Sequence, residues 1–448
     1  MSNIIFSFLM RGHILYPLPM RWLSLFLFLT ASLSAGTLRI SVEGESALIM
    51  NAKTGQVLFE KNGHAQVFPA STTKIATALL AVHKARGQLE KVITAERESL
   101  VSITPEAKKQ SNYRSPPHWI ESDSSHIGIK KGEELRLFDL LNGMMIASGN
   151  DAANVIALGL GGTIPKYMDE VNAYLKSIGC KNTHFNNPHG LHHPEHFTTA
   201  YELALMARFA LKDPVLRRIV STPRYVCPQT NLEEERTFTQ TNLLLRSGAH
   251  HYPKAMGVKT GYTQAAGKNL VAAAQSGDRE LIVVAMGYRG PRAELYKDVI
   301  KMFETGFNEP KMRRSLLPKG QQKLTAKVQG ARAMLRTYLN EGLAYEFYPT
   351  EEVPVKVVAT WEIPSLPILR GTSVGKVKVL DEQGTVLGQM PLLALEDLNP
   401  TIWHRISAFF SQSKLGRKLA FGMGVTLVLL FLLGARNKRV RPYTKYSK

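Results

Sequence analysis

The sequence predicts an α/β (α+β) domain at 37–308, a small all-β domain at 309–398 and a C-terminal transmembrane helix. Apolar strand-like runs between 256 and 287, with helical patterns before them, indicate the α/β part. Short alternating runs separated by turn signals indicate the all-β part, at 353–361, 374–380 and 385–389. An uncharged apolar run of 17 residues at 419–435 indicates the membrane helix.

The charge distribution argues against a nucleic-acid partner. The 448 residues carry a formal net charge of +20, and 44% of them are hydrophobic, as in folded proteins. Ten Lys or Arg and no Asp or Glu lie between Thr401 and Lys448, which is half of the excess. The sequence shows no zinc-finger or RNA-binding signature. A basic segment beside a membrane explains the charge better.

Residues 1–35 have the pattern of a secretory signal peptide. Arg21 precedes the apolar run 22–30, and the small residues that follow suit cleavage near 34–36. An uncleaved anchor is the less favoured alternative, because the run is short for a membrane span. The cysteines of an exported chain can pair, but two separate buried thiols are the simpler expectation for Cys180 and Cys227.

Residues 399–448 predict a membrane anchor. Apolar side chains fall on one helical face at about 400–413, which suits the membrane interface or packing on the protein. As a helix, 419–435 spans about 26 Å, close to the ~30 Å of a hydrocarbon core. The basic residues from Arg436 onward place the C-terminus on the cytoplasmic side.

The first domain begins with a predicted hairpin, 47–50 and 56–59, and continues into a predicted helix. Residues 96–135 are polar and rich in proline, which predicts a long loop that is either functional or disordered. Apolar residues at helical spacing from Leu137 to Met145 then predict a core helix. A tight connection at 148–151 precedes a second helix from Ala152, and its side chains can project into a cleft.

A Ser-x-x-Lys motif at the start of the first predicted helix is the candidate nucleophile. Ser71 and Lys74 share one helical face, and Ser71 lies near the positive end of the helix dipole. A free amine at Lys74 can take the Ser71 proton, as covalent catalysis requires. About two such matches are expected by chance, and 373–376 and 411–414 also match. The assignment therefore depends on accompanying motifs.

Histidines spaced three or four apart between His184 and His196 raise the alternative of a metal site. Pro188 and Pro194 break any helix that would align them. The chain contains no His-Glu-x-x-His motif. We expect ordinary packing histidines and no metal.

Two further motifs support the assignment of Ser71 and Lys74 as catalytic residues. The only Ser-x-Asn is at 148–150, and Lys259-Thr260-Gly261 leads into the strand-rich segment. An identical Lys-Thr-Gly at 53–55 lies in the predicted hairpin turn and is set aside. Ordered this way, the motifs resemble the penicillin-binding protein and serine β-lactamase superfamily. Longer stretches resemble D-alanyl-D-alanine carboxypeptidases of the low-molecular-mass penicillin-binding group, at 68–74, 148–153, 187–191, 199–200 and 257–267.

The resemblance covers about 37–435 and implies a β-lactamase/DD-peptidase-like fold with an antiparallel sheet and a helical subdomain. It implies that Ser71 attacks the carbonyl between two D-alanines of a peptidoglycan stem peptide and forms an acyl-enzyme. Lys74 is then the base, and Ser148 relays a proton to the leaving D-alanine. β-Lactams would acylate Ser71, and the reaction needs no cofactor or metal. The enzyme would face the periplasm from the cytoplasmic membrane of a bacterium.

The substrate-binding residues also follow from the resemblance. Asn150 would hold Lys74 and the substrate amide. Lys259 and Thr260 would bind the terminal carboxylate, with assistance from Arg292. The backbone N–H groups of Ser71 and Tyr262 would form the oxyanion hole, with Gly261 completing the Lys-Thr-Gly motif. The β-rich domain would act as a stalk or contact envelope proteins.

Three alternatives remain at this point. A class A β-lactamase needs a Glu-x-x-x-Asn loop, but Thr199 follows Glu195 and Met206 follows Glu202 at that spacing. A DD-endopeptidase, which cuts cross-links, shares every motif and stays open. A non-catalytic binding module would not need both lysines. The chain departs from the family in a long 104–125 segment and in Glu202, where an Asp is usual.

Overall fold

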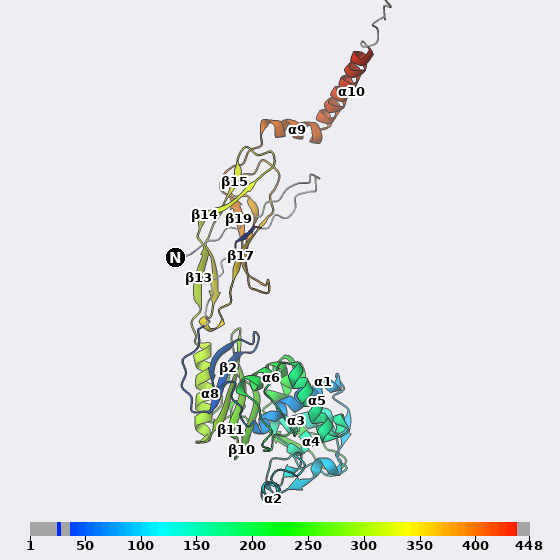
Figure 1. The fold of residues 1–448 in the computed structure, drawn as a ribbon, viewed down its shortest axis with the longest axis vertical. Coiled ribbons are helices and arrows are strands. Elements are labelled where there is room, and N and C mark those ends of the chain that lie inside the picture. Colours follow the sequence, from blue (N-terminus) through cyan, green and yellow to red (C-terminus); the bar gives the residue numbers. More distant parts are fainter. Residues whose placement is uncertain (1–24, 28–35, 437–448) are drawn as a thin grey trace, which may run out of the picture. The chain divides into compact units, whose positions relative to one another are not determined.

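The computed structural model describes residues 25–27 and 36–436 (Figure 1). The chain forms two compact units. Among the described residues, the N-terminal unit comprises 36–311 and Tyr348–Glu352, and the C-terminal unit comprises 25–27, Met312–Phe347 and 353–436. The predicted signal peptide lies outside the described residues except for β1 (Leu25–Leu27), which pairs with a strand of the C-terminal unit.

A five-stranded antiparallel sheet forms the centre of the N-terminal unit, in the order β10-β11-β12-β2-β3. The predicted hairpin and strand-rich segment are confirmed as β2 (Ser46–Asn51), β3 (Val57–Lys61), β10 (Ala255–Thr263), β11 (Gly267–Ser276) and β12 (Arg279–Tyr288). Every residue of β12 is buried. This burial requires cover on both faces of the sheet.

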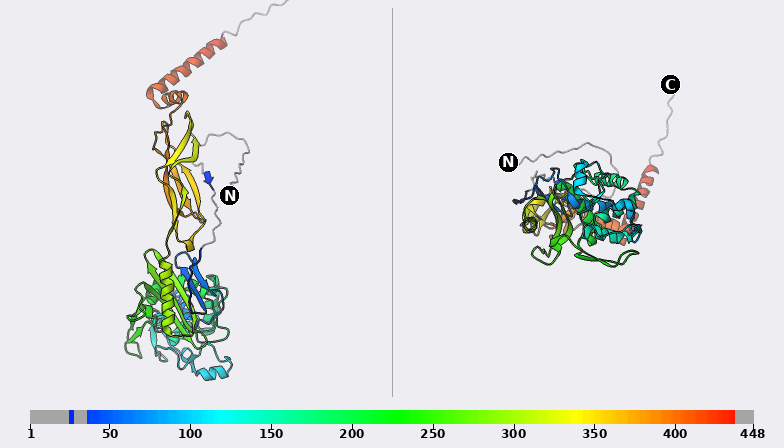
Figure 2. Two further views of the ribbon diagram at one scale, coloured as in Figure 1. Left: turned by 90° about the vertical axis from the view of Figure 1, so that its left-hand side faces the viewer. Right: turned by 90° about the horizontal axis from the view of Figure 1, so that it is seen from below.

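Helices supply that cover (Figures 1 and 2). One face packs against α8 (Arg292–Phe307) through a cluster that includes Val283 and Phe303. The other face packs against a helical cluster that includes Ile282 and Val284. Its helices are α1 (Lys74–Ala85), α3 (Leu137–Ile146), α4 (Asn150–Gly161), α5 (Ile164–Ser177), α6 (Ala200–Lys212) and α7 (Pro214–Val220).

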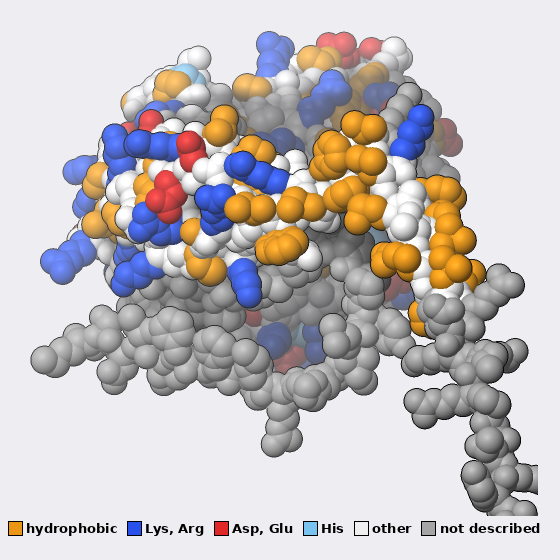
Figure 3. Space-filling model, turned by 90° about the horizontal axis from the view of Figure 1, so that it is seen from above, with side chains coloured by type: hydrophobic (Ala, Val, Ile, Leu, Met, Phe, Trp, Pro, Cys, Tyr) orange, Lys and Arg blue, Asp and Glu red, His pale blue; other side chains and the backbone are white. Residues whose placement is uncertain are grey.

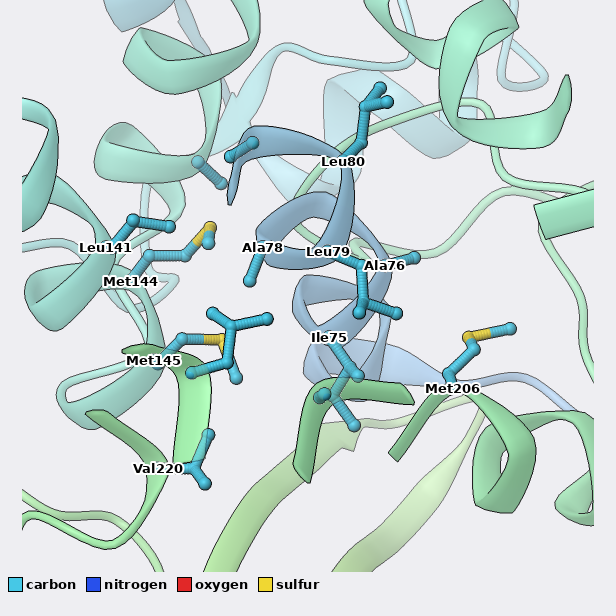
Figure 4. Packing of buried hydrophobic residues seen from close by; sticks show 14 of the residues in the cluster. Ile75, Ala76, Ala78, Leu79, Leu80, Leu141, Met144, Met145, Met206 and Val220 are labelled. Atoms are coloured by element: carbon cyan, nitrogen blue, oxygen red, sulfur yellow. The ribbon is translucent and has the colours of Figure 1, made fainter. Parts of the chain in front are cut away.

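Helix α1 lies in the middle of this helical cluster. Figure 4 shows Ile75 and Leu79 of α1 between Met145 of α3 and Met206 of α6. These side chains are at most 4% exposed. Burying apolar surface stabilises folding by roughly 25 cal/mol per Å², so α1 is held firmly in one orientation. The position of the residues just before α1 is therefore fixed as well.

The prediction of a long loop at 96–135 is wrong in part. The segment contains a 3-10 helix (Arg97–Leu100), α2 (Pro105–Gln110) and a parallel pair of short strands, β5 (Ser102–Ile103) and β6 (Ile120–Glu121). Thr104 caps α2 by accepting a hydrogen bond from the Ala107 N–H. Side-chain contacts therefore order a segment whose composition favours a loop.

Shorter elements complete the N-terminal unit. They are a 3-10 helix η1 (Ala70–Thr73), the pairs β4 (Val92–Thr94) with β7 (Glu134–Arg136) and β8 (Arg224–Cys227) with β9 (Arg236–Thr239), and the 3-10 helices η3 (Leu243–Leu245) and η4 (Pro349–Glu351). Cys180 and Cys227 are both buried and free. Their burial raises the pKa of each thiol, to about 12 for Cys180 and about 11 for Cys227.

The C-terminal unit is built from strands followed by two helices. A six-stranded sheet has the order β1-β17-β18-β19-β15-β14, and β13 pairs with β16. The strands are β13 (Met312–Leu317), β14 (Gly320–Lys327), β15 (Met334–Leu339), β16 (Leu343–Phe347), β17 (Lys356–Trp361), β18 (Ser373–Leu380) and β19 (Val386–Ala394). A separate apolar cluster that includes Val377 and Leu392 forms its core.

The two C-terminal helices expose apolar side chains. In α9 (Ile402–Gln412), Trp403 is 80% exposed. In α10 (Lys414–Arg436), Leu415–Leu433 has a mean hydropathy of 1.7, enough by length and composition to cross a membrane. Figure 3 shows hydrophobic side chains gathered on this end of the C-terminal unit beside Lys and Arg. α10 begins earlier than predicted, because the Ser413 hydroxyl accepts a hydrogen bond from the Gly416 N–H.

A buried arginine ties Tyr348–Glu352 to the sheet of the N-terminal unit. The guanidinium of Arg279, on β12, donates hydrogen bonds to Glu309 at 2.8 Å and to Glu351 at 2.9 Å. The Arg279 side chain is 3% exposed, and those of Glu309 and Glu351 are 5% and 14% exposed. Both carboxylates depend on this one cation.

Replacing Arg279 tests this contact. Arg279→Met leaves two largely buried carboxylates without a positive charge, although Thr350 still donates to Glu309 and Asn51 to Glu351, so we expect the free energy of unfolding to fall by about 3–5 kcal/mol. Urea unfolding of the purified protein measures the change. Lys311→Met is the control, because its pair with Asp278 is long, at 3.8 Å, and exposed. The control should lose less than about 1 kcal/mol, and equal losses in both variants would contradict the interpretation.

Candidate active site

The Ser-x-x-Lys motif lies where the sheet meets α1. Ser71 is in η1, directly before α1, and Ala70 has a left-handed backbone with φ of +51°. The Asn269 side chain on β11 donates hydrogen bonds to the carbonyls of Phe68 at 2.9 Å and Pro69 at 3.1 Å. Its own carbonyl accepts a hydrogen bond from the backbone N–H of Gly287 on β12. One buried amide thus fixes the nucleophile turn to two strands.

Gly261 allows strand β10 to lie against the same turn. A Cβ atom at this position would be 2.9 Å from the Pro69 oxygen and 3.0 Å from the Ser71 nitrogen. Contacts this short with backbone atoms require the turn or the strand to move. The glycine of the Lys-Thr-Gly motif therefore sets the distance between β10 and Ser71.

Lys74 is fully buried beside Ser71. Its Nζ lies 2.9 Å from Ser71 Oγ, 2.7 Å from Asn150 Oδ1 and 2.8 Å from the backbone oxygen of His189. Burial, and then the charge of Lys259, hold the pKa of Lys74 well below its usual value, while Asp151 opposes them. A lysine in this environment is suited to act as a base.

A second buried lysine faces the inter-helix connection. Lys259 Nζ donates hydrogen bonds to Ser148 Oγ at 3.0 Å and to the Thr260 carbonyl at 3.1 Å. Burial lowers the pKa of Lys259 to about 7. Ser148 has a left-handed backbone, with φ of +66°, and α4 starts at Asn150 rather than at the predicted Ala152. A non-glycine residue held there is typical of functional sites.

Ser71 lines two cavities that together form a cleft. One, of about 430 Å³, is also lined by Ser148, Thr241, Thr260, Arg246 and Arg292. The other, of about 650 Å³, is also lined by Asn150 and by residues of the α2 segment. Tyr262 lines both cavities and is 65% exposed. The structure thus places Arg292 in the lining of the smaller cavity, and it places the buried amines of Lys74 and Lys259 against Ser71 and Ser148 of the same cleft.

Most histidines of 184–196 make local hydrogen bonds, and His192 instead packs its ring edge-on against Phe68 and Tyr113. His196 Nε2 lies 2.8 Å from Thr73 Oγ1, and its Nδ1 accepts from the Asn186 N–H. His189 Nδ1 accepts from the Leu191 N–H. Within residues 25–27 and 36–436, no group of three or more His, Cys, Asp or Glu is arranged to hold a metal ion. In the structure these rings order the chain beside the nucleophile.

Sequence reasoning missed four supporting residues. Asn269 holds the nucleophile turn, Thr241 Oγ1 accepts a hydrogen bond from Thr260 at 2.8 Å, and Ser124 Oγ accepts from Asn150 at 2.9 Å. Asp151 accepts the N–H groups of Ile127 and Ile129. Only Asp151 adjoins a motif. The other three lie far along the chain from their partners, so spacing gives no signal.

Removing the Asn269 amide tests its positioning role. Asn269→Ala removes the bonds to the Phe68 carbonyl and the Gly287 N–H and one of the bonds to the Pro69 carbonyl, which keeps the Thr72 hydroxyl, so we expect stability to fall by about 1–3 kcal/mol. We also expect slower acylation of Ser71 by benzylpenicillin in the folded fraction, measured by mass spectrometry. Asn269→Asp keeps the acceptor for Gly287 but loses both donated bonds. Acylation at the wild-type rate in both variants would refute the role.

Comparisons with known proteins agree with this geometry. A family model described as D-alanyl-D-alanine carboxypeptidase, peptidase S11, matches residues 32–290. The D-alanyl-D-alanine carboxypeptidase DacF of Bacillus subtilis is 30% identical over 366 residues, covering 81% of this chain and 87% of DacF. DacD of Escherichia coli is 27% identical over 385 residues, covering 82% of this chain and 90% of DacD.

Solved structures show the same fold. Penicillin binding protein 6B from Escherichia coli has a TM-score of 0.55 at 23% identity, covering 80% of this chain and 96% of that one. Penicillin binding protein 5 from Haemophilus influenzae has a TM-score of 0.54 at 22% identity, covering 81% and 100%. The expected DD-peptidase fold, with helices and strands together, is confirmed. The chain therefore belongs to the D-alanyl-D-alanine carboxypeptidase family, peptidase family S11.

Proposed function

We propose that this protein removes the terminal D-alanine from peptidoglycan stem pentapeptides through an acyl-enzyme at Ser71. Membership of a serine-type carboxypeptidase family supports the reaction class. The observation that carries the assignment is the contact of 2.9 Å between Ser71 Oγ and the buried Nζ of Lys74. Nucleophile and base within hydrogen-bonding distance are the requirement for covalent catalysis.

Lys74 is the proposed general base. An unperturbed lysine is neutral in only about one molecule in 2,500 at pH 7. Burial and the neighbouring Lys259 lower the pKa of Lys74 and so raise its neutral fraction. In the acylation step, Ser71 Oγ bonds to the carbonyl carbon between the two D-alanines, and its proton passes to Lys74 Nζ. Asn150 and the His189 carbonyl hold the amine in place.

Ser148 and Lys259 are the proposed route to the leaving group. The bond between the carbonyl carbon and the D-alanine nitrogen breaks, and that nitrogen needs a proton. Ser148 Oγ can relay the proton from Lys74, while the contact of 3.0 Å from Lys259 orients its hydroxyl. Water then hydrolyses the acyl-enzyme and regenerates Ser71. The atoms of the reaction balance without an added cofactor.

The smaller cavity is the proposed site for the terminal D-alanine. Lys259 and Arg292 offer N–H donors to its carboxylate, and the Thr260 hydroxyl would donate to it by turning away from Thr241. Arg292 and Thr260 both line this cavity. The N–H groups of Ser71 and Tyr262 are the proposed oxyanion hole, where one donor is often worth ~3–4 kcal/mol. β-Lactams, which penicillin-binding proteins of this fold bind, would acylate the same serine.

The ends of the chain support a membrane location. We propose that 1–35 directs export, that α10 crosses the cytoplasmic membrane of a bacterium, and that α9 lies in its interface. The basic residues after α10 would remain in the cytoplasm. The small all-β domain predicted at 309–398 would hold the catalytic domain away from the membrane or contact envelope proteins.

Ser71→Ala tests the reaction directly. The detergent-solubilised full-length protein should release D-alanine from an N-acylated Lys-D-Ala-D-Ala peptide, and the variant should not, because the attacking oxygen is gone. Free D-alanine is measured with a coupled oxidase. A cross-linked muropeptide dimer serves as the parallel substrate. Cleavage of the dimer without D-alanine release would instead show that the protein is an endopeptidase. If the folded wild type cleaves neither substrate and does not react with penicillin, the hypothesis that it is an enzyme is wrong.

The pH dependence of acylation tests Lys74 as the base. The pKa of Lys74 is depressed, so the neutral amine is present above that lowered pKa and is lost as the pH falls through it. We expect the rate of acylation by benzylpenicillin to rise with pH. The midpoint of this rise should lie well below pH 10.5, the ordinary pKa of a lysine. Lys259→Met removes the positive charge that, after burial, lowers the pKa of Lys74. The midpoint of the rise should therefore move to higher pH.

Lys53→Met is the matched control for the pH profile. Lys53 belongs to the other Lys-Thr-Gly sequence and donates to the Asp278 carbonyl at the surface. Its removal should leave the midpoint unchanged. The proposed base would be contradicted if the midpoint stays unchanged in Lys259→Met. It would also be contradicted if the wild-type midpoint lies near the ordinary lysine pKa.

A further inference from the structure

Apart from Ser71, Asn150 and Tyr262, the residues that line the larger cavity have no part in the chemistry described above. Its floor includes Ser71 and Asn150, and one wall comes from the α2 segment, defined here as 104–123. That wall contributes Lys108, Lys109 and Tyr113. The volume of about 650 Å³ lies in the usual range for ligand sites. The α2 segment thus forms one wall of this cavity.

Buried contacts hold this wall in place. Lys108 Nζ lies 2.8 Å from Glu121 Oε1, and the Lys108 side chain is 3% exposed. Asn154, on α4, donates a hydrogen bond of 2.8 Å to the His118 carbonyl. The Tyr113 ring packs edge-on against His192, with ring centroids 5.4 Å apart. The wall is therefore a fixed surface, which is what a binding subsite requires.

The direction of the reaction decides which part of a substrate meets this wall. The proposed carboxylate donors and Arg292 lie at the smaller cavity, so the leaving D-alanine occupies that side. The acyl group stays on Ser71. The stem residue that precedes the two D-alanines must then extend on the opposite side of Ser71, into the larger cavity. This step rests on the proposed function.

The wall offers one cation and one anion to that residue. Lys108 is neutralised by Glu121, but Lys109 is exposed and makes no ion pair with any residue in the described part of the chain. Asp123, also exposed, lines the same cavity without an ion-pair partner among the described residues. A side chain that ends in an ammonium and a carboxylate matches both charges. A side chain that ends in an ammonium alone matches only Asp123.

We propose that the α2 segment forms a subsite that selects stem peptides whose residue before the two D-alanines ends in an amino-carboxylate group. Lys109 binds the carboxylate of that group, and Asp123 binds its ammonium. Exposed charge pairs of this kind are typically worth a factor of about two to five in binding. The segment thereby sets substrate choice and leaves the reacting groups unchanged.

Two pentapeptides that differ only in the third residue test the subsite, one with meso-2,6-diaminopimelate and one with L-lysine. The full-length protein in detergent should give a kcat/KM about threefold to fivefold higher for the diaminopimelate peptide. Lys109→Met should lower kcat/KM for that peptide alone and abolish the preference. Asp123→Asn should lower kcat/KM for both peptides by similar factors, because both carry the ammonium.

Lys176→Met is the control, because this exposed lysine on α5 lines none of the cavities at Ser71. It should change neither peptide's kcat/KM. Wild-type acylation by benzylpenicillin in all three variants verifies that they fold. Equal kcat/KM for both peptides in the wild type, or an equal loss for both in Lys109→Met, would overturn the subsite. Release of D-alanine from neither peptide would overturn the proposed function instead, so the two failures are distinguishable.

Discussion

The structure depends on keeping two lysine amines out of water next to a serine hydroxyl. An unpaired ammonium inside a protein costs several kcal/mol, so Lys74 needs oxygen atoms around it or a lowered pKa. It has both: three oxygens lie within 2.9 Å, and burial with Lys259 lowers its pKa. Those oxygens come from η1, α4 and the segment before α6. The amine therefore links three distant stretches of chain. The burial that makes its charged form costly also favours the neutral form, which is the form that can accept a proton.

The scaffold around this amine has one consistent purpose. The apolar face of α1 is packed on all sides, which leaves its N-terminal end pointing at the edge of the sheet. Asn269 fixes the preceding turn to β11, and Gly261 lets β10 lie close beside it. Lys259 and Thr260, on that same strand, are brought to the other side of Ser71. Core packing and one buried amide together set distances that catalysis needs within a few tenths of an ångström.

The sequence predicted those parts of the site whose contacts are local in the chain. Ser71 and Lys74 share one turn, and Ser148 with Asn150 share one connection, so their spacing carried the information. The strands 255–288 were also visible as apolar runs. Asn269 and Thr241 act across long separations and have no pattern of their own. The 104–125 segment was predicted as a loop because its prolines and charges outweighed contacts such as Lys108 with Glu121, which only tertiary structure reveals.

The two sides of the cleft are supported differently, and this difference has a functional consequence. The carboxylate side is built on β10 and α8, and the packing of the sheet fixes both. The acyl side includes the α2 segment, which lies outside the core and is joined to α4 by the hydrogen bond from Asn154 to the His118 carbonyl. Changes in α2 can therefore alter which stem peptide fits while Lys74 keeps its three oxygen partners. On the proposed function, the core would hold the reacting groups and the peripheral α2 segment would set substrate choice, so a substitution in that segment would change one without the other.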